Sequence, residues 1–289
     1  IAVMGHVMVP EMVKRGYDRN FAAAVTAAGG LMSPIIPPSM LFVIYGVLAQ
    51  ISIGDMFIAG IIPGLLMGAA FILVVVVLGF FYTYPTEAKL SRGTAVSHIL
   101  RALPSLSIPV VIIGGIAGGI ATPTESAAVA SVAAIIVGWA FHREFDPSHI
   151  PGMLVRLLAS SSMVLFLVAT ANVFGWIIVY EKIPQNLAAY LVTLTENPIV
   201  FMLLLNVMLL LVGTVIDAIA ALILVVPIML PIAMLSYGID PFHFGVAVCL
   251  NLVIGLLTPP VGTALYVTAQ VSNCKPMSIM KPLAPFLLA

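Results

Sequence analysis

Residues 58–82 form an apolar run that contains no charged side chain. A helix needs about 20 such residues to cross the hydrocarbon core of a bilayer, where only a helix or a closed barrel satisfies its own backbone. The rest of the chain is similar, because 62% of its residues are hydrophobic and 8% are charged. A soluble domain carries roughly 25% charged residues. We therefore predict an all-α integral membrane protein.

Other runs have the same length and apolar character, namely residues 103–120, 126–141, 160–179, 199–212 and 218–235. Each is predicted to be a membrane-spanning helix. Two linkers, residues 86–102 and 143–156, mix basic with apolar side chains. Such segments lie in the membrane interface, where Lys and Arg extend toward the headgroups. We predict an interfacial helix for each linker.

Residues 21–50 and 242–272 are apolar as well, but Pro and Gly interrupt both of them near the middle. Neither half of either segment is long enough to cross a bilayer alone. Irregular backbone at membrane depth is tolerated only where protein buries it or where it lines a wet cavity. We predict that each segment is a re-entrant helical hairpin with its tip at membrane depth.

The two interrupted segments also resemble each other. The sequence GLMSP at residues 30–34 matches GLLTP at residues 255–259, and AQIS at 49–52 matches AQVS at 269–272. Pro38-Ser39 aligns with Gly262-Thr263, and residues 7–18 run parallel to residues 227–240. Broken apolar segments at corresponding positions of two halves indicate the binding site of a transporter built from inverted repeats.

Charges suggest how the segments are oriented. Lys14, Arg15 and Arg19 precede the first segment, whereas the approach to the second segment carries no Lys or Arg. The positive-inside rule then predicts that the first segment enters from the cytoplasm and the second from outside. The basic residues that do not fit this topology are Lys89, Arg92, Lys275 and Lys281.

Two carboxylates, Glu125 and Asp217, lie deep in apolar sequence. A charge at mid-membrane costs about 2.5–3.5 kcal/mol on insertion scales, so each is a functional candidate. Glu125 has a structural alternative, because Thr122, Pro123 and Glu125 form the pattern of a helix capping box. Asp217 shows no such pattern. Asn172, Asn206 and Asn251 are expected to hydrogen-bond between helices.

Several function classes find no support in the sequence. Eleven basic and eleven acidic residues give no net charge, which argues against a nucleic-acid partner. No HExxH, GxSxG or Walker motif is present, so neither intramembrane hydrolysis nor direct use of ATP is indicated. The cysteines, Cys249 and Cys274, are expected to be buried free thiols. We predict that the protein is not an enzyme.

Four motifs, GGLMSPIIPPS, GGIATPTESAA, GTVIDAIAALILVVPIMLPIA and GLLTPPVGTALYV, occur in this order along the chain. In these motifs the sequence resembles the large membrane (M) subunit of tripartite ATP-independent periplasmic (TRAP) transporters. The resemblance implies an elevator-type, Na⁺-coupled importer of organic acids such as sialic acid or C4-dicarboxylates in the bacterial inner membrane. It also implies a periplasmic substrate-binding protein and a small four-helix membrane (Q) subunit as partners.

The resemblance further implies two Na⁺ sites and a substrate site between the tips. One Na⁺ site would involve Ser33, Pro34, Thr122 and Thr124. The other would involve Gly213, Asp217, Thr258 and Pro259. Substrate would contact Ser33, Pro38, Ser39, Thr258, Gly262 and Thr263.

The chain begins and ends inside apolar runs, so we expect it to be an interior piece of a longer protein. We predict four parts. Residues 1–56 hold the first hairpin of a transport domain, and residues 57–103 hold a spanning helix with an interfacial arm. Residues 104–159 hold a helix pair broken at TPTE with a second arm, and residues 160–289 hold the second repeat. The alternatives are a stand-alone Na⁺/dicarboxylate carrier of similar architecture and, with less support, a channel, which would need a continuous polar pore.

Overall fold

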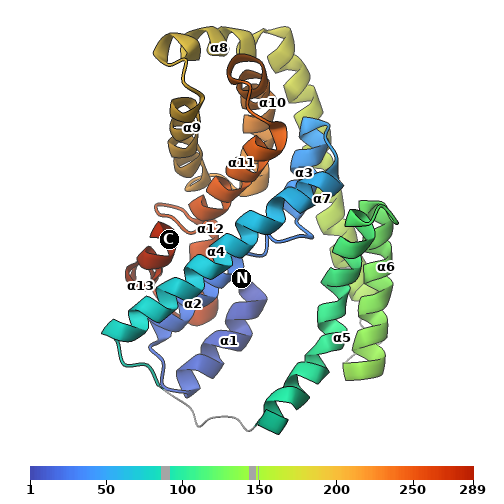
Figure 1. Ribbon diagram of the computed structural model, residues 1–289, viewed down its shortest axis with the longest axis vertical. Helices are drawn as coiled ribbons and strands as arrows, with labels where there is room; N and C mark the ends of the chain where they lie inside the picture. Colours follow the sequence, from blue (N-terminus) through green and yellow to red (C-terminus); the bar gives the residue numbers. More distant parts are fainter. Residues whose placement is uncertain (86–91, 143–147, 149) are drawn as a thin grey trace.

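The computed structural model describes residues 1–85, 92–142, 148 and 150–289, and this part of the chain contains helices and no strand (Figure 1). The helices are α1 (Ala2–Lys14), α2 (Arg19–Leu31), α3 (Met40–Ala49), α4 (Ile53–Phe81), α5 (Arg92–Ala117), α6 (Pro123–Ile136), the π-helix η1 (Val137–His142), α7 (Ile150–Tyr180), α8 (Ile183–Leu194), α9 (Pro198–Gly213), α10 (Ala218–Tyr237), α11 (Pro241–Gly255), α12 (Thr263–Ser272) and α13 (Pro276–Leu288).

Four helical stretches in the described part are long and apolar enough to cross a membrane, namely Ile53–Phe81, Pro123–Ala140, Ile150–Tyr180 and Ala218–Tyr237. The apolar side chains of the first three are largely exposed, most of all along α7, whereas half of the apolar window in Ala218–Tyr237 is buried. Apolar surface of this extent is stable only against lipid or another membrane protein. The predicted class, an all-α integral membrane protein, is confirmed.

Helix α4 packs on α3 and on the break before it, and then continues beside α2. Its glycines at positions 60, 64 and 68 face this neighbour: a Cβ at Gly60 would overlap the Phe42 ring of α3. A Cβ at Gly68 would lie 2.7 Å from Met32 Cε, in the break. Further along, Tyr84 stacks on Phe21 of α2 with ring centroids 4.7 Å apart. Since α4 is one continuous helix of 29 residues, α2 and α3 lie end to end beside it.

The predicted hairpin at residues 21–50 is therefore wrong, and the segment is one broken crossing. Helix α2 has 13 residues and α3 has 10, which give about 20 and 15 Å at 1.5 Å per residue. Neither half spans a hydrocarbon core of about 30 Å, but the two in series do. A hairpin and a broken crossing share the same local pattern of two short apolar helices with a Pro- and Gly-rich break. The neighbouring helix decides between them.

The segment at residues 242–272 is also a broken crossing, and it runs in the opposite direction. Where α11 begins, the Tyr45 hydroxyl, near the end of α3, donates to the Pro241 carbonyl. Beyond the end of α12, the Ser278 hydroxyl donates to Asn20 Oδ1, at the start of α2, over 2.7 Å. The start of each crossing thus lies near the end of the other. The predicted inverted repeat is confirmed, with crossings in place of hairpins.

The helical hairpin in this repeat is formed by α9 and α10. At its open end, the rings of Phe201 and Tyr237 stack with centroids 4.3 Å apart, and the Tyr237 hydroxyl donates to the Thr195 carbonyl over 3.0 Å. Residues 214–217, within the GTVID sequence, close the other end. The predicted helices at 199–212 and 218–235 are thus the two arms of one hairpin.

Helix ends also correct the pairing of the two repeats. Asp18 caps α2 and Asp240 caps α11. Helix α3 ends in Gln50 at φ 55°, and α12 ends in Asn273 at φ 52°. The helix ends thus pair Gln50 with Asn273, three positions beyond Gln270, the partner of Gln50 in the match of AQIS with AQVS. The left-handed residue that ends each helix, rather than the Ala-Gln sequence, marks the corresponding point.

The two predicted interfacial helices are absent as separate elements. Helix α5 runs without interruption from Arg92 to Ala117, through Pro104 and Pro109, and α7 runs from Ile150 to Tyr180. The remainder of these two predictions, residues 86–91, 143–147 and 149, lies outside the described residues. Basic residues at the end of an apolar helix gave a pattern that resembles a separate amphipathic segment. Helices α8 and α13 were not predicted.

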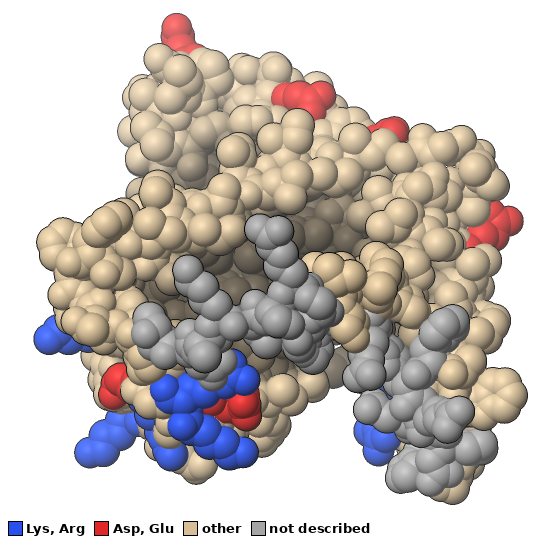
Figure 2. Space-filling model, turned by 60° about the horizontal axis from the view of Figure 1, so that its bottom comes forward, with Lys and Arg blue, Asp and Glu red and all other residues tan. Residues whose placement is uncertain are grey.

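Lys and Arg side chains gather at one end of the crossings, where Glu11 and Asp18 also lie (Figure 2). The end where α1 stops, α2 begins and α12 leads into α13 carries Lys14, Arg15, Arg19, Lys275 and Lys281. The opposite end carries Asp55, Glu181, Lys182, Glu196 and Asp240. Because both interrupted segments cross, the basic residues at positions 275 and 281 no longer violate the positive-inside rule. Helix α5 also begins at the basic end (Figure 1).

We predict that single cysteines will report these crossings. In a full-length background without other cysteines, Lys14→Cys and Asn273→Cys should react with a membrane-impermeant thiol reagent from one side only. Gln50→Cys and Ile239→Cys should react from the other side, because positive-inside places the basic end in the cytoplasm. Lys14, Gln50 and Asn273 are exposed, so access to the reagent is not limited by packing.

Labelling of positions 14 and 50 from the same side would support a re-entrant hairpin and contradict the broken crossing. Labelling of positions 14 and 239 from the same side would contradict the inverted repeat.

Candidate functional site

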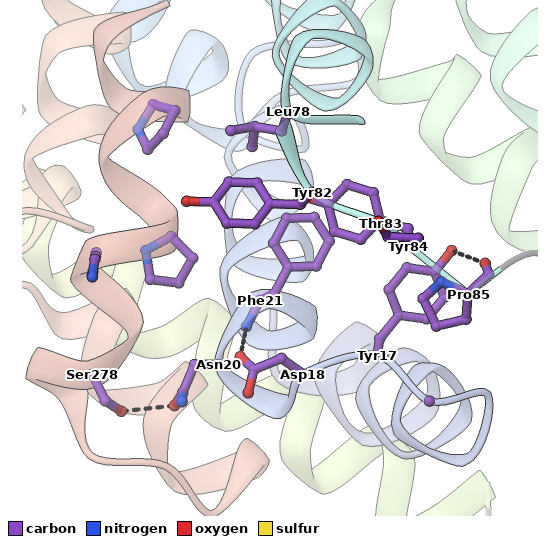
Figure 3. A pocket seen from close by; sticks show the side chains of 14 residues that line it. Tyr17, Asp18, Asn20, Phe21, Leu78, Tyr82, Thr83, Tyr84, Pro85 and Ser278 are labelled. Carbon is purple, nitrogen blue, oxygen red and sulfur yellow. Dashed lines mark hydrogen bonds between the residues drawn. The ribbon is translucent and has the colours of Figure 1, made fainter. Parts of the chain in front are cut away.

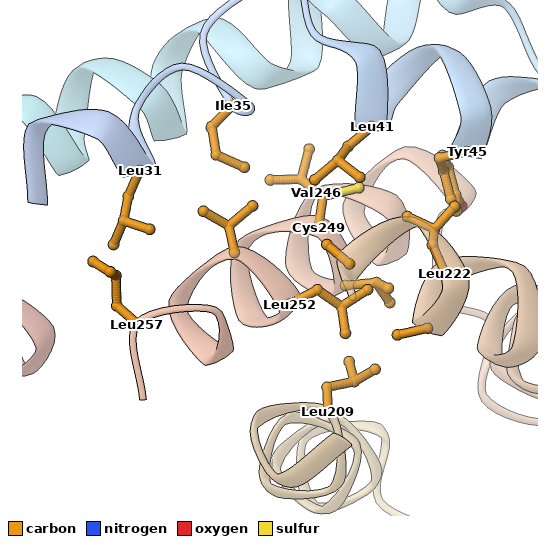
Figure 4. Packing of buried hydrophobic residues seen from close by; sticks show 14 of the residues in the cluster. Leu31, Ile35, Leu41, Tyr45, Leu209, Leu222, Val246, Cys249, Leu252 and Leu257 are labelled. Atoms are coloured by element: carbon orange, nitrogen blue, oxygen red, sulfur yellow. The ribbon is translucent and has the colours of Figure 1, made fainter. Parts of the chain in front are cut away.

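The interruptions of the two crossings lie beside each other in the middle of the molecule. Leu31 ends α2 and Leu257 lies in the second break, and Figure 4 shows the two side chains facing each other. Both are buried in one continuous core with Ile35 of the first break. Helix α11 forms the centre of this core, where Leu252 and Cys249 are fully buried between α3, α9 and α10. Irregular backbone from both repeats is thereby packed against protein on one side, while residues such as Ser33, Pro38 and Pro260 are exposed.

The tip of the α9–α10 hairpin touches the second break through two glycines. A Cβ at Gly255 would lie 2.7 Å from Gly213 Cα and 2.8 Å from the Gly213 carbonyl carbon. A Cβ at Gly213 would lie 3.1 Å from Gly255 Cα. Both glycines are buried. Only residues without side chains allow two helix ends to approach this closely.

Hydrogen bonds fasten the same contact. The Thr214 carbonyl of the hairpin tip accepts from the Gly262 N–H over 2.9 Å and from the Val261 N–H over 3.2 Å. Gly262 has φ +40°, and a Cβ there would lie 2.8 Å from the Thr258 carbonyl oxygen. This position therefore requires glycine on conformational and steric grounds. The hairpin tip and the second break form one unit.

The arrangement concentrates partial negative charge. Helices α9 and α11 both end at this contact, and the end of each carries the equivalent of about half a negative charge. Among the described residues, no donor reaches the carbonyls of Gly213, Leu257 or Thr258. Free carbonyls at helix ends, together with hydroxyl and carboxylate oxygens, are the groups that hold Na⁺ in transporters with broken helices. The residues present therefore fit a Na⁺ site.

Asp217 lies at the other side of the hairpin tip and is the N-cap of α10. Its carboxylate accepts from the Ile219 N–H over 3.1 Å, and the residue is exposed. The expectation that Asp217 lacks a structural role is therefore wrong. The cap lacks the Glu or Gln at N3 that makes a capping box recognisable in sequence. One carboxylate oxygen is used by the cap, and the other is available to an ion.

Thr258 and Pro259 of the second break are half-buried. The Thr258 hydroxyl donates to the Ile254 carbonyl over 3.0 Å, which leaves its lone pairs available as acceptors. Thr263 is exposed, and Gly262 is buried with its N–H bound to Thr214. Of the residues predicted at this site, Gly213, Thr258, Pro259 and Gly262 are brought together by the hairpin contact.

The first break has a related construction. Ser39 caps α3 by accepting from the Phe42 N–H over 3.2 Å, and its hydroxyl donates to the Pro34 carbonyl. Ser39 is buried, so its side chain holds the break in shape. Ser33 and Pro38 are exposed, and the Ser33 hydroxyl has no partner among the described residues.

The structure does not bring Thr122 and Thr124 to the first break. Helix α6 packs on α5 and η1 and has no comparable contact with α2 or α3. The expected capping box is confirmed: the Thr122 N–H donates to Glu125 Oε2 over 2.8 Å, and the Glu125 N–H donates to Thr122 Oγ1 over 3.3 Å. The carboxylate of Glu125 is thus committed to the start of α6.

Of the three asparagines expected to join helices, two do so beside the site. Asn251 Nδ2 donates to Asn206 Oδ1 over 2.8 Å and joins α11 to α9, as expected. Asn172 instead bonds to the Val168 carbonyl of its own helix. The parts that sequence reasoning missed are the Thr214 carbonyl and the role of Gly255. Gly255 stood in the repeated GLLTP sequence, but its partner Gly213 is remote along the chain.

Over residues 1–289 the chain matches the protein family described as "DctM: Tripartite ATP-independent periplasmic transporter, DctM component". It is 40% identical over 289 residues to the sialic acid TRAP transporter large permease protein SiaM of Vibrio cholerae. It is 39% identical over 294 residues to the isethionate TRAP transporter permease protein DctMQ of Oleidesulfovibrio alaskensis. It is 34% identical over 288 residues to the C4-dicarboxylate TRAP transporter large permease protein DctM of Pseudomonas aeruginosa.

These matches cover 99%, 99% and 100% of the chain, respectively. They cover 66%, 45% and 67% of the three relatives. The chain thus spans about half to two thirds of the length of these proteins.

We predict that Gly255→Ala separates the hairpin tip from the second break. The added methyl group would meet backbone atoms, which cannot rotate away, so the expected cost is about 1–3 kcal/mol. The midpoint of thermal unfolding of the purified full-length protein should fall by several degrees. Gly29→Ala is the matched control, because a Cβ at this helical glycine meets nothing within 4 Å. Equal midpoints for the two variants would contradict the close contact.

Proposed function

Because the chain belongs to the DctM family of tripartite ATP-independent periplasmic transporters, we propose that it is the large permease of a Na⁺-coupled importer of organic acids. The protein would act in the bacterial inner membrane, with its basic end in the cytoplasm. Its role is transport rather than catalysis. Na⁺ would bind first at the interrupted helices and complete a site for the anionic substrate.

One observation carries this proposal, namely the contact between the α9–α10 hairpin tip and the break between α11 and α12. The ends of α9 and α11 meet there, with free carbonyls at Gly213 and, in the break, at Leu257 and Thr258. Asp217 follows in the hairpin turn. A bound Na⁺ would hold the tip against the break, because its ligands come from both. Ion binding would thus be coupled to the shape of the segment that faces the substrate.

The same breaks offer positive helix ends to an anion. Helix α3 begins after the first break, and α12 begins after the second break without a side-chain cap. At the start of α3 the N–H groups of Met40 and Leu41 have no acceptor among the described residues. At the start of α12, again within the described part of the chain, only the Thr263 N–H is free, because those of Ala264 and Leu265 bond to the Leu256 carbonyl. Free N–H groups at a helix start favour negatively charged ligands. Ser33, Pro38 and Thr263 are the exposed candidates for substrate contact, and Ser39 and Gly262 shape the backbone behind them. Sialic acid, a C4-dicarboxylate and isethionate, which name the three relatives, are all organic anions.

A second Na⁺ would bind at the first break, at Ser33 and Pro34. By the internal symmetry, its remaining ligands would come from a hairpin equivalent to α9–α10. Thr122 and Thr124 could contribute only after α6 approached the first break. Movement of the two crossings together with the hairpins would give the elevator cycle.

Two partners complete the proposal. A periplasmic binding protein would deliver the substrate, and a small membrane subunit (Q) would brace the helices that do not belong to the repeat. The name DctMQ of one relative combines the letters of both membrane subunits. Helices α5, α6, η1 and α7 expose apolar side chains such as Trp139 of η1 and Phe166 of α7, which lipid or this subunit would cover.

Uptake by proteoliposomes tests the proposal. The full-length protein with its small subunit should accumulate a labelled organic acid only when Na⁺ is outside and the binding protein is present. Uptake without a binding protein would favour the stand-alone carrier, and passive flux that no ion gradient accelerates would favour a channel.

We predict that Thr258→Ala and Ser33→Ala each raise the Na⁺ concentration for half-maximal uptake. Loss of one oxygen ligand should cost about 1–3 kcal/mol, which is a factor of roughly 5 to 150. Thr170→Ala is the control, because its hydroxyl also bonds to its own helix, at the Phe166 carbonyl, but remote from the breaks. Unchanged Na⁺ dependence in both test variants would remove these residues from the ion sites.

A separate prediction concerns Asp217→Asn. Asparagine caps a helix as well as aspartate does, so the structural role should survive. The charge is lost, so the Na⁺ concentration for half-maximal uptake should rise. The midpoint of thermal unfolding without Na⁺ should stay unchanged. A lower midpoint with unchanged Na⁺ dependence would instead assign Asp217 to capping alone.

A further inference from the structure

A cavity of about 570 Å³ lies at the basic end of the molecule, away from the two breaks. It is bounded by the turn between α1 and α2, by the end of α4 with the residues after it, and by α13 (Figure 3). None of the residues assigned above to ions or substrate lines this cavity. Its chemistry therefore needs a separate explanation.

Aromatic rings form one wall. Tyr84, Phe21 and Tyr17 form one cluster of rings, in which the Tyr84 centroid lies 4.7 Å from Phe21 and 6.0 Å from Tyr17. The Tyr17 hydroxyl donates to the Pro85 carbonyl over 3.3 Å. Burial, followed by the neighbouring Tyr82 and Tyr17, raises the pKa of Tyr84 and keeps it a neutral donor. Tyrosines at the end of a membrane-spanning helix mark the level of the lipid headgroups.

The facing wall is polar and basic. Ser278 and Asn20 are hydrogen-bonded to each other there, and Lys281 lines the cavity without an ion pair to any described residue. Asp18 also lines the cavity, but its carboxylate accepts from the Phe21 N–H as the cap of α2. Lys14, Arg15 and Arg19 belong to the same end of the molecule (Figure 2). The mouth is thus suited to a negatively charged group.

An apolar groove adjoins this mouth on the side of the first break. A second cavity, of about 330 Å³, is lined by Val25, Ala28, Gly29 and Met32 of the α2 side, by α4 from Gly68 to Val76, and by Phe286. These are the next turns of the helices that bound the mouth at Phe21, Leu78 and Pro285. A Cβ at Gly29 meets nothing within 4 Å, so the groove is open at this point.

The length of the groove matches one leaflet of a bilayer. From Phe21 to Met32 the helix rises about 16 Å at 1.5 Å per residue. Half of a hydrocarbon core of about 30 Å is about 15 Å. The polar mouth lies at the level of the headgroups, and the apolar part has the depth of an acyl chain from the same leaflet.

We propose that an anionic phospholipid of the leaflet at the basic end occupies this site. Its phosphate lies at the mouth near Lys281, the tyrosine rings and Asn20, and one acyl chain follows the α2–α4 groove to Met32. The chain end then lies beside Ser33 of the first break, so an occupied groove supports the break from the lipid side. The proposal depends on membrane insertion and not on the identity of the transported solute.

Lipid titration of the purified full-length protein tests this inference. Phosphatidylglycerol and phosphatidylcholine with identical chains are added to delipidated protein, and bound lipid is counted by native mass spectrometry. Phosphatidylglycerol should bind with a saturable stoichiometry of one and in preference to phosphatidylcholine. Glycerol phosphate, which has the head and no chains, should not compete.

Two variants distinguish binding of the lipid headgroup from binding of the acyl chain. Lys281→Gln should weaken phosphatidylglycerol about fivefold and leave phosphatidylcholine unchanged, as expected for one basic side chain near the membrane surface. Gly29→Leu fills the groove and should abolish saturable binding of both lipids. Gly79→Leu is the control, since Gly79 lies on α4 outside both cavities, with open space around it.

Other outcomes would overturn the proposal. Equal binding of the two lipids by the wild type, or unchanged binding by Gly29→Leu, would exclude a lipid in this groove. Displacement by glycerol phosphate would assign the mouth to a soluble phosphate compound. Absence of any saturable lipid would indicate that a segment of the full-length protein covers the groove.

Discussion

Unpaired backbone groups cannot face lipid, and this constraint organises the whole structure. Each crossing is interrupted in its middle, so other protein must enclose the freed carbonyls and amides. Helix α4 covers the first break with its glycine face, and the α9–α10 hairpin covers the second break through Gly213 and the Thr214 carbonyl. These contacts stabilise the breaks and hold their oxygens and N–H groups in fixed positions. Ions and anionic substrates are the natural ligands of such a site.

The opposite directions of the two crossings explain the charge pattern. Helix α2 begins at the basic end and α12 ends there, so Lys and Arg before one crossing and after the other share one side of the membrane. The same arrangement places the two breaks at a common depth, with Leu31 beside Leu257 (Figure 4). This arrangement is compatible with the proposed function, in which a single central site would be reached alternately from either side. The lipid groove along α2 and α4 would connect this centre to one leaflet.

The sequence predicted the features that depend on local signals. Long apolar runs gave the membrane class, Pro and Gly gave the two breaks, and the match of GLMSP with GLLTP gave the repeat. The direction of the chain after each break could not be predicted from local signals, because a hairpin and a crossing have the same residue types at the break. The glycines at 60, 64 and 68, one turn apart on α4, were the signal for the crossing, since they mark the face that receives a neighbouring helix. The contact of Thr214 with Val261 and Gly262 joins distant segments through backbone atoms, so no pattern of side chains in the sequence predicts it.

Na⁺ binding in the absence of substrate is the most direct test of the account. The midpoint of thermal unfolding of the purified full-length protein is measured in increasing NaCl, with KCl and choline chloride at equal ionic strength as references. A bound ion stabilises the folded state in proportion to the logarithm of its concentration above the dissociation constant. We expect a Na⁺-specific rise in the wild type that is logarithmic in the NaCl concentration. Gly255→Ala should reduce this rise to the part that comes from the first break. Identical midpoints in the three salts, or an equal rise in Gly255→Ala, would contradict a Na⁺ site at the hairpin contact.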